Sequence, residues 1–297
     1  MQTGTAMIMT IKPLQRVTGS TGGILLLVTA LAIGSAILWQ SLHSPSGFPG
    51  TGNSSPSAKG MLSPGTLAAA DEENEGGCDP MVFDALLGTY VSNGRVDYKG
   101  LKGNEQFASF LKSLEDATLE GMSQDAQLAF WINAYNASVI SNVIAHPGIK
   151  GPLEVEGFFD KVTFKVAGKE VTLNDIENTI VRPTFKEPLI HFGLVCAAVS
   201  CPPLISNAYT EENVRQELAN NARNYLSDKQ QNHFDAKTGT LHLSKIFEWY
   251  KVDFGGDDAG LIAFAKEYGP EEMKNGLEKA KKVTVAFVEY DWKLNSK

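Results

Sequence analysis

The segment from Ser123 to Ala145 constrains the fold of this chain more than any other. It contains the run LAFWINAYNASVISNVIA, which is apolar on nearly every side of a helix, and it stops before Pro147. A helix that is apolar all round has no face suited to water, so it belongs inside a domain. We therefore predict a buried helix over residues 123–145, with other elements packed around it.

Other elements are predicted from hydrophobic periodicity, caps and turn residues. Helices are expected at 80–90, around 107–114 and at 174–182, 211–226, 246–250 and 261–268. Hairpins are expected over 161–173 and around Thr238-Gly239, a buried strand over 189–199 and a final strand over 282–290. Because helices cluster early while strands are few and scattered, the predicted fold class is α+β, a single compact domain whose helices pack on a small, mainly antiparallel sheet.

The N-terminal part of the chain has a different character. Residues 22–40 contain no charge, and an apolar helix of about 20 residues can cross a membrane. Lys12 and Arg16 precede this stretch, and no Lys or Arg follows until Lys59. The positive-inside rule then places residues 1–21 in the cytoplasm, with a signal-anchor helix over 22–41.

Residues 42–78 are rich in Ser, Gly and Pro, which predicts a disordered linker before a globular domain at 79–297. The alternative is a signal peptide cleaved near Gly34-Ser35-Ala36, which would release the domain. Both alternatives place the domain outside the cytoplasm, in a periplasm or outside the cell. The membrane is then a partner only through the N-terminal helix.

Composition excludes several classes of function. The net charge is −8, which argues against nucleic-acid binding and against a polybasic lipid surface. Three cysteines are too few for a disulfide scaffold. The chain has no phosphate loop, nucleotide fingerprint, zinc-protease helix or calcium loop, so no cofactor is predicted, and the scattered histidines argue against a metal site. The expected partner is a small-molecule or peptide-like substrate.

Two asparagines stand out on the apolar helix. Asn133 and Asn136 are three residues apart, so they share a face, and a buried amide is costly unless it is hydrogen-bonded. They could donate hydrogen bonds to a substrate carbonyl or oxyanion. Alternatively, they form a satisfied core network that ties loops to the helix.

The segment from His191 to Pro203 holds the densest set of reactive residue types. On a strand, Cys196 would point away from His191, while Cys201 would follow the strand beside two prolines and be better exposed. A cysteine nucleophile needs a partner for its thiolate and a group that orients this partner. We predict Cys201 as the nucleophile and His191 as the base, oriented by Glu177 or Asp291. A small core residue at Cys196, a Cys196–Cys201 disulfide and a zinc ligand remain alternatives.

Five segments together resemble the family named domain of unknown function 547. They are AFWINAYNA (129–137), TLNDIEN (172–178), IHFGLVCAAVSCPPL (190–204), LSKIFEWYKVDF (243–254) and YDWKLN (290–295). The resemblance implies no settled activity, although many members carry an export signal. The polar residues that recur in the family correspond here to Asn133, Asn136, Glu177, His191, Cys196, Ser200, Cys201 and Asp291. The histidine that commonly follows the glutamate is replaced here by Asn178.

Three functions are compatible with the sequence. The first is a membrane-tethered, exported cysteine hydrolase or acyltransferase acting on amides or esters, with Asn133 or Asn136 as the oxyanion donor. The second is a non-catalytic envelope binding or assembly module in which the same polar cluster is structural. The third is a thiol–disulfide protein, although four residues separate the two cysteines instead of the usual two.

Overall fold

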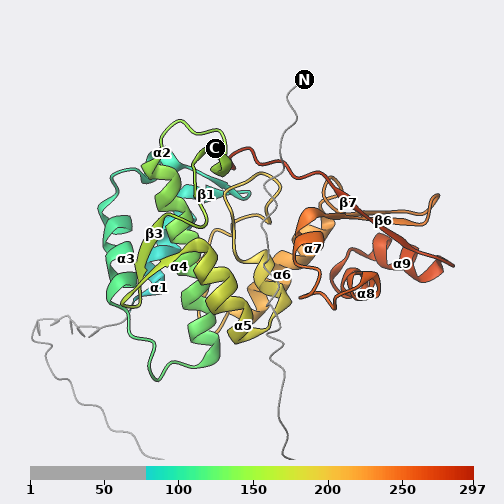
Figure 1. Cartoon of the computed structure of the whole chain (residues 1–297), viewed down its shortest axis with the longest axis horizontal. Helices are drawn as coiled ribbons and strands as arrows, with labels where there is room; N and C mark the ends of the chain where they lie inside the picture. Colours follow the sequence, from blue (N-terminus) through green and yellow to red (C-terminus); the bar gives the residue numbers. More distant parts are fainter. Residues whose placement is uncertain (1–77) are drawn as a thin grey trace, which may run out of the picture. The chain divides into compact units, whose positions relative to one another are not determined.

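Helix α4 (Gln124–Ala145) lies at the centre of the core. The computed structural model describes residues 78–297. Ser123 caps α4 by accepting a hydrogen bond from the backbone N–H of Ala126, and every residue from Leu128 to Ile140 is buried. The predicted buried helix is confirmed. Figure 1 shows α1 (Pro80–Tyr90) and α3 (Glu105–Asp116) beside α4, and both pack on it together with α6 (Val214–Ser227).

The remaining helical elements are shorter. They are α2 (Tyr98–Leu101), η1 (Pro152–Glu154), η2 (Asp175–Val181), α5 (Arg182–Phe185), η3 (Pro188–Phe192), α7 (Lys245–Trp249), α8 (Asp258–Tyr268) and α9 (Glu271–Lys279). Within residues 78–297, no helix combines the length and the apolar character that a membrane span requires. The predicted cytoplasmic segment and signal-anchor helix lie outside the described residues, as does nearly all of the predicted linker.

Strands form three separate small sheets. β1 (Val91–Ser92) pairs with β2 (Arg95–Val96), and β3 (Thr163–Val166) pairs with β4 (Lys169–Thr172), both antiparallel. In the third sheet, β6 (Thr240–Ser244) lies between an antiparallel β5 (His233–Asp235) and a parallel β7 (Thr284–Val288). The α+β class and both predicted hairpins are confirmed, but within residues 78–297 the strands do not form one sheet beneath the helices.

The predicted strand over residues 189–199 is wrong. Its first part is the 3₁₀ helix η3, and an irregular loop follows to Cys201. A buried loop is possible only when its backbone groups find partners. Here the partners are side chains: Asn136 bonds Gly193 O and Val195 N, and Asn221 donates to Phe192 O.

Helix η2 also differs from the prediction. Asn174 does not cap it; instead, Thr172 and Asp175 bond each other's side chains and backbone N–H groups reciprocally, as in a capping box. The segment is a π-helix, and α5 continues it past Pro183 to Phe185. The π-helix is rare and is frequently found at functional sites.

The C-terminal segment after β7 runs along the loop that carries the cysteines. The backbone N–H groups of Val199 and Ser200 donate to Lys293 O and Asp291 O, at 2.8 and 3.2 Å, and Asn295 N donates to Ala197 O at 2.9 Å. Backbone bonds to the C-terminal segment therefore hold the loop at Ala197, Val199 and Ser200.

Candidate functional site

The two cysteines of the loop face each other. Cys196 Sγ lies 2.8 Å from Cys201 Sγ and 3.1 Å from the Tyr290 hydroxyl, and both thiols are free. Cys196 N also donates to Cys201 Sγ at 2.9 Å. Between them, Ala197 adopts a positive φ of 65°, which costs free energy in a residue other than glycine. Strained backbone of this kind is concentrated at functional sites.

Their surroundings shift the pKa values of the two thiols in opposite directions. Burial raises the pKa of Cys196, but hydrogen bonds from Cys201, Tyr290 and the backbone N–H of Ala198 outweigh burial and leave this pKa below its ordinary value. Burial and the neighbouring Cys196 sulfur hold the pKa of Cys201 well above the ordinary value. Burial and Cys196 also raise the pKa of Tyr290, so its hydroxyl keeps its proton and can donate a hydrogen bond to Cys196. The thiolate of the pair therefore resides on Cys196.

The predicted exposure of the two cysteines is wrong. Cys201 is buried, with 8% of its surface exposed, whereas Cys196 is half-buried. The prediction assumed a strand that ends before Cys201, but the loop turns Cys201 inward beneath Cys196.

His191 is held by a residue that the sequence did not identify. Its Nε2 lies 2.7 Å from Asp253 Oδ2, and its ring stacks on Tyr250. Arg182 donates to both oxygens of Asp253 through Nε and Nη2, at 2.7 and 2.9 Å. Burial raises the pKa of Asp253, but His191 and Arg182 outweigh burial and lower it well below the usual range. An ionised Asp253 only accepts hydrogen bonds, so Nε2 carries a proton and Nδ1 is the nitrogen free for chemistry.

Glu177 lies on the other side of the imidazole. Its Oε1 is 3.8 Å from His191 Nδ1, beyond hydrogen-bonding distance, and 9% of the residue is exposed. Of the two orienting residues that the sequence suggested, Glu177 lies near His191 but makes no hydrogen bond with it. After burial, Glu177 is the largest influence that raises the pKa of Tyr250, and its charge also acts on Cys196. The carboxylate of Glu177 therefore lies near the His191 imidazole, and its charge also raises the pKa of Cys196.

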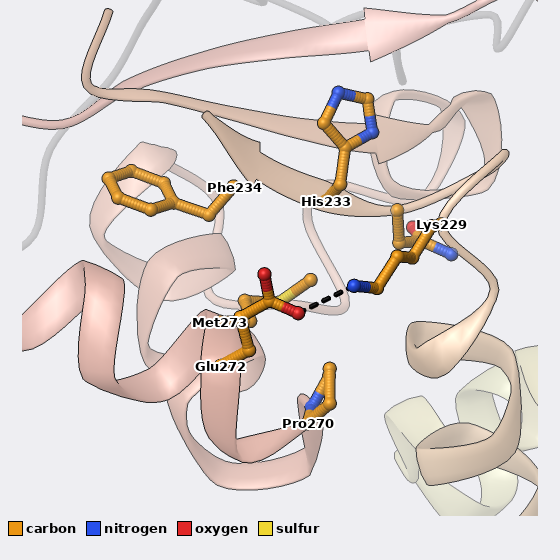
Figure 2. A pocket seen from close by; sticks show the side chains of 7 residues that line it. Lys229, His233, Phe234, Pro270, Glu272 and Met273 are labelled. Carbon is orange, nitrogen blue, oxygen red and sulfur yellow. Dashed lines mark hydrogen bonds and ion pairs between the residues drawn. The ribbon is translucent and has the colours of Figure 1, made fainter. Parts of the chain in front are cut away.

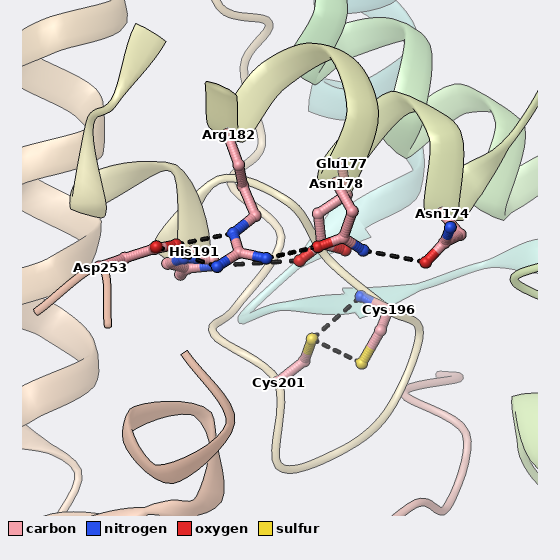
Figure 3. Close-up of polar contacts among 8 residues, drawn as sticks. All are labelled: Asn174, Glu177, Asn178, Arg182, His191, Cys196, Cys201 and Asp253. Atoms are coloured by element: carbon pink, nitrogen blue, oxygen red, sulfur yellow. Dashed lines mark hydrogen bonds and ion pairs between the residues drawn. The ribbon is translucent and has the colours of Figure 1, made fainter. Parts of the chain in front are cut away.

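Figure 3 shows this arrangement in one view. The side chains of Asp253, His191, Arg182, Glu177, Asn178 and Asn174 form one row, and the two cysteines lie to one side of it. Asn178, which replaces the histidine common in the family, accepts from Arg182 Nη1 and donates to Asn174. Among the described residues, no hydrogen bond joins His191 to either cysteine, and no cluster of three metal-ligating side chains is found.

Asn133 and Asn136 are backbone clamps. Asn133 donates to Tyr209 O at 2.7 Å and accepts from Tyr209 N at 3.0 Å. Asn136 donates to Gly193 O at 2.8 Å and accepts from Val195 N at 2.9 Å. Both are buried, and the amides are committed to the loops that they hold. Their geometry matches the core network that the sequence left open, and it gives no support to an oxyanion role.

Asp291 does not approach His191 through any hydrogen bond or ion pair of the described residues. Its carboxylate pairs with Lys293 at 3.3 Å, and its own N–H donates to Ser200 Oγ at 2.9 Å. The structure thus gives the orienting position to Asp253 and places Asp291 in the segment that fixes the cysteine loop.

Three aromatic rings lie beside the thiolate. The Tyr290 ring packs on Trp249 and Trp292, with centroids 4.9 and 4.7 Å away, while its hydroxyl contacts Cys196. Trp249 is 41% exposed, so this ring cluster reaches from solvent to the sulfur.

A separate cavity of about 330 Å³ lies between β5 and the start of α9. Figure 2 shows Lys229 and Glu272 bonded across it, with Phe234, Pro270 and Met273 around them. None of Glu177, His191, Cys196 or Cys201 lines this cavity. The cavity and the reactive cluster are therefore different places, and the candidate site is the cluster.

Comparison with known proteins finds a family model that matches part of the chain. Residues 119–226, which include Glu177, His191 and both loop cysteines, match the family model described as "Protein of unknown function, DUF547". No curated protein and no solved structure matches the chain. The match covers the central helix and the cysteine loop, and the chain is a DUF547 domain-containing protein.

Proposed function

We propose that this protein is a cysteine-dependent hydrolase or acyltransferase acting on amide or ester bonds, with Cys196 as the nucleophile. The observation that carries the proposal is the contact of Cys196 Sγ with two groups that can donate to a thiolate, the Cys201 thiol at 2.8 Å and the Tyr290 hydroxyl at 3.1 Å. A thiolate is the reactive form of cysteine, and donors that stabilise it activate the nucleophile. Cys201 serves as a donor to this thiolate in place of the nucleophilic role that the sequence suggested.

The chemistry assigns His191 to proton transfer. The proton that the Cys196 thiol loses passes to His191 Nδ1. Cys196 Sγ then bonds to the substrate carbonyl carbon, and the leaving amine or alcohol takes this proton from Nδ1 as its bond to that carbon breaks. Water or an acceptor then gives a proton to Nδ1 while its oxygen attacks the thioester, and the thiolate leaves. Asp253 acts as a positioning residue, because its bond to Nε2 leaves Nδ1 free.

The alternative is a non-catalytic binding or assembly module. It is favoured by the complete hydrogen bonding of Asn133 and Asn136 and by the lack of a direct bond between His191 and a cysteine within residues 78–297. In such a module the Arg182–Asp253–His191 group would be a buried ion-pair network.

We also propose that the domain works outside the cytoplasm. The support is the charge-free stretch over residues 22–40 and the basic residues before it, which favour an N-terminal anchor or a cleaved signal. N-terminal sequencing of protein from the membrane and soluble fractions separates these two forms.

Turnover of a simple ester tests the enzymatic proposal. The reduced full-length chain is mixed with p-nitrophenyl acetate, and p-nitrophenolate release is followed beyond one equivalent. We expect Cys196→Ser to abolish turnover, Cys201→Ser to reduce it because the thiolate loses a donor, and Cys78→Ser to match the wild type. Equal turnover by Cys196→Ser and the wild type would contradict the proposal.

A further inference from the structure

The facing thiols of Cys196 and Cys201 are close to the geometry of a disulfide. Their sulfurs are 2.8 Å apart, which is about 0.8 Å more than an S–S bond. The loop between them is fixed by backbone bonds to Asp291 and Lys293 that involve neither sulfur. A bond between the sulfurs therefore requires a small movement of two side chains and leaves the backbone bonds to Asp291 and Lys293 in place.

The two thiols also have different chemical roles. Cys196 is half-buried and has a lowered pKa, whereas Cys201 is buried and has a raised pKa. A cysteine of lowered pKa beside a thiol that keeps its proton is the arrangement of an oxidation-sensitive cysteine with a resolving cysteine. Cys78 provides an internal comparison, because it contacts Ser113 Oγ at 3.3 Å and burial raises its pKa.

We propose that Cys196 and Cys201 form a peroxide-sensitive pair that closes reversibly into a disulfide and so switches the site off. The loss of activity on closure rests on the proposed function; the closure itself does not. The pair differs from a structural disulfide in that the reduced state is the working one.

The reaction balances with a hydroperoxide as the oxidant. Cys196 Sγ attacks one peroxide oxygen, an S–O bond forms, the O–O bond breaks, and the departing oxygen takes a proton and leaves as water or an alcohol. Cys201 Sγ then attacks the sulfenic sulfur of Cys196; the S–S bond forms, the S–O bond breaks, and hydroxide leaves as water with the proton of Cys201. An external dithiol reverses the change and becomes a disulfide itself.

Peptide mass spectrometry of the full-length chain tests the pair. The protein is reduced with dithiothreitol, freed of it, treated with hydrogen peroxide and alkylated in denaturant before digestion. We expect a cross-linked peptide that contains Cys196 and Cys201, loss of ester turnover, and recovery of both thiols and turnover with dithiothreitol. Recovery of both cysteines as alkylated thiols, or oxidation of Cys78 ahead of Cys196, would overturn the proposal.

Two variants complete the test. In Cys201→Ser we expect peroxide to leave a sulfenic acid on Cys196 that dimedone traps and that proceeds to the irreversible sulfinic acid. Cys78→Ser is the matched control, in which the cross-linked peptide forms as in the wild type. A cross-link without ester turnover by the reduced protein rejects the proposed function and retains the pair, whereas turnover with only sulfinic acid in the wild type rejects the pair.

Discussion

Two groups of buried polar residues meet at the same loop, and they differ in how their polar atoms are occupied. On α4, Asn133 exchanges two hydrogen bonds with the backbone of Tyr209, and Asn136 exchanges two with Gly193 and Val195, so their amides are engaged on both sides. In the reactive cluster, His191 Nδ1 lies 3.8 Å from Glu177 Oε1, too far for a hydrogen bond, and the sulfurs of Cys196 and Cys201 contact each other.

This difference separates polar groups that stabilise the fold from polar groups that can take part in a reaction. A buried amide with both sides bonded stabilises one conformation, and its removal leaves orphaned backbone groups. A buried nitrogen or sulfur whose lone pair is not fixed by the fold can accept a proton or attack a carbon. The asparagines therefore hold the loop that presents the thiolate, and the predictions below test this division of roles.

The largest effect on activity short of removal of the nucleophile is expected for Asp253→Asn. The carboxylate fixes Nε2 of His191, and loss of its charge leaves the imidazole free to turn. General acid–base catalysis contributes about two to four orders of magnitude, so we expect kcat to fall by that range. Steady-state ester hydrolysis measures the change.

The matched control for Asp253 is Asp291→Asn, whose exposed carboxylate pairs only with Lys293 among the described residues. We expect kcat to stay within about threefold of the wild type, because an exposed ion pair contributes little free energy. An equal loss in both variants would show that charge in general, and not the bond to His191, sets the rate.

On the structural side of the comparison, Asn136→Ala is expected to lower stability. The change leaves Gly193 O and Val195 N without their partner in the core. Each orphaned group costs about 1–3 kcal/mol, so we expect the free energy of unfolding to fall by about 2–5 kcal/mol in urea denaturation. Asn220→Ala, on the exposed face of α6, should change it by less than about 0.5 kcal/mol. Similar values for the two variants would contradict the clamp.

Only a small change in stability is expected for Ala197→Gly. Glycine relieves the positive φ of 65° but loses a buried methyl group and adds freedom to the unfolded chain. These contributions oppose each other, so the free energy of unfolding should change by less than about 1 kcal/mol. The looser loop should nevertheless raise the pKa of Cys196, since Ala198 N–H is no longer held toward the sulfur. Thermal unfolding and thiol alkylation of the same sample separate the two effects.

Sequence reasoning succeeded where the signal is local. The buried helix α4 and both hairpins follow from patterns within a few residues. Helix α9 (Glu271–Lys279) was not predicted, because only Met273 and Leu277 of its residues are buried. The apolar run from Leu189 was interpreted as a strand because its real partners, the amides of Asn136 and Asn221, come from distant helices.

The candidate site was predicted only in part, because some of its contacts join residues that are far apart in the sequence. Glu177 and His191 were expected together and lie together. Asp253 lies 62 residues after His191, and nothing in its own segment indicates which imidazole it bonds. The prediction of which cysteine is more exposed was wrong because it assumed a strand over residues 189–199, where the structure has η3 and a loop. A polar residue on a helix that is otherwise wholly apolar is the signal that could have revealed the buried loop.

The central claim is that the thiolate resides on Cys196, and the alkylation rate of each cysteine against pH tests it most directly. Iodoacetamide labelling of the reduced full-length chain, quantified by peptide mass spectrometry, gives one profile per cysteine. Because its pKa is lowered, Cys196 should react fastest at neutral pH and lose reactivity only as the pH falls through a value below about 8.5, while Cys201 and Cys78 stay slow. Faster labelling of Cys201, or a Cys196 profile at the ordinary pKa, would contradict the account.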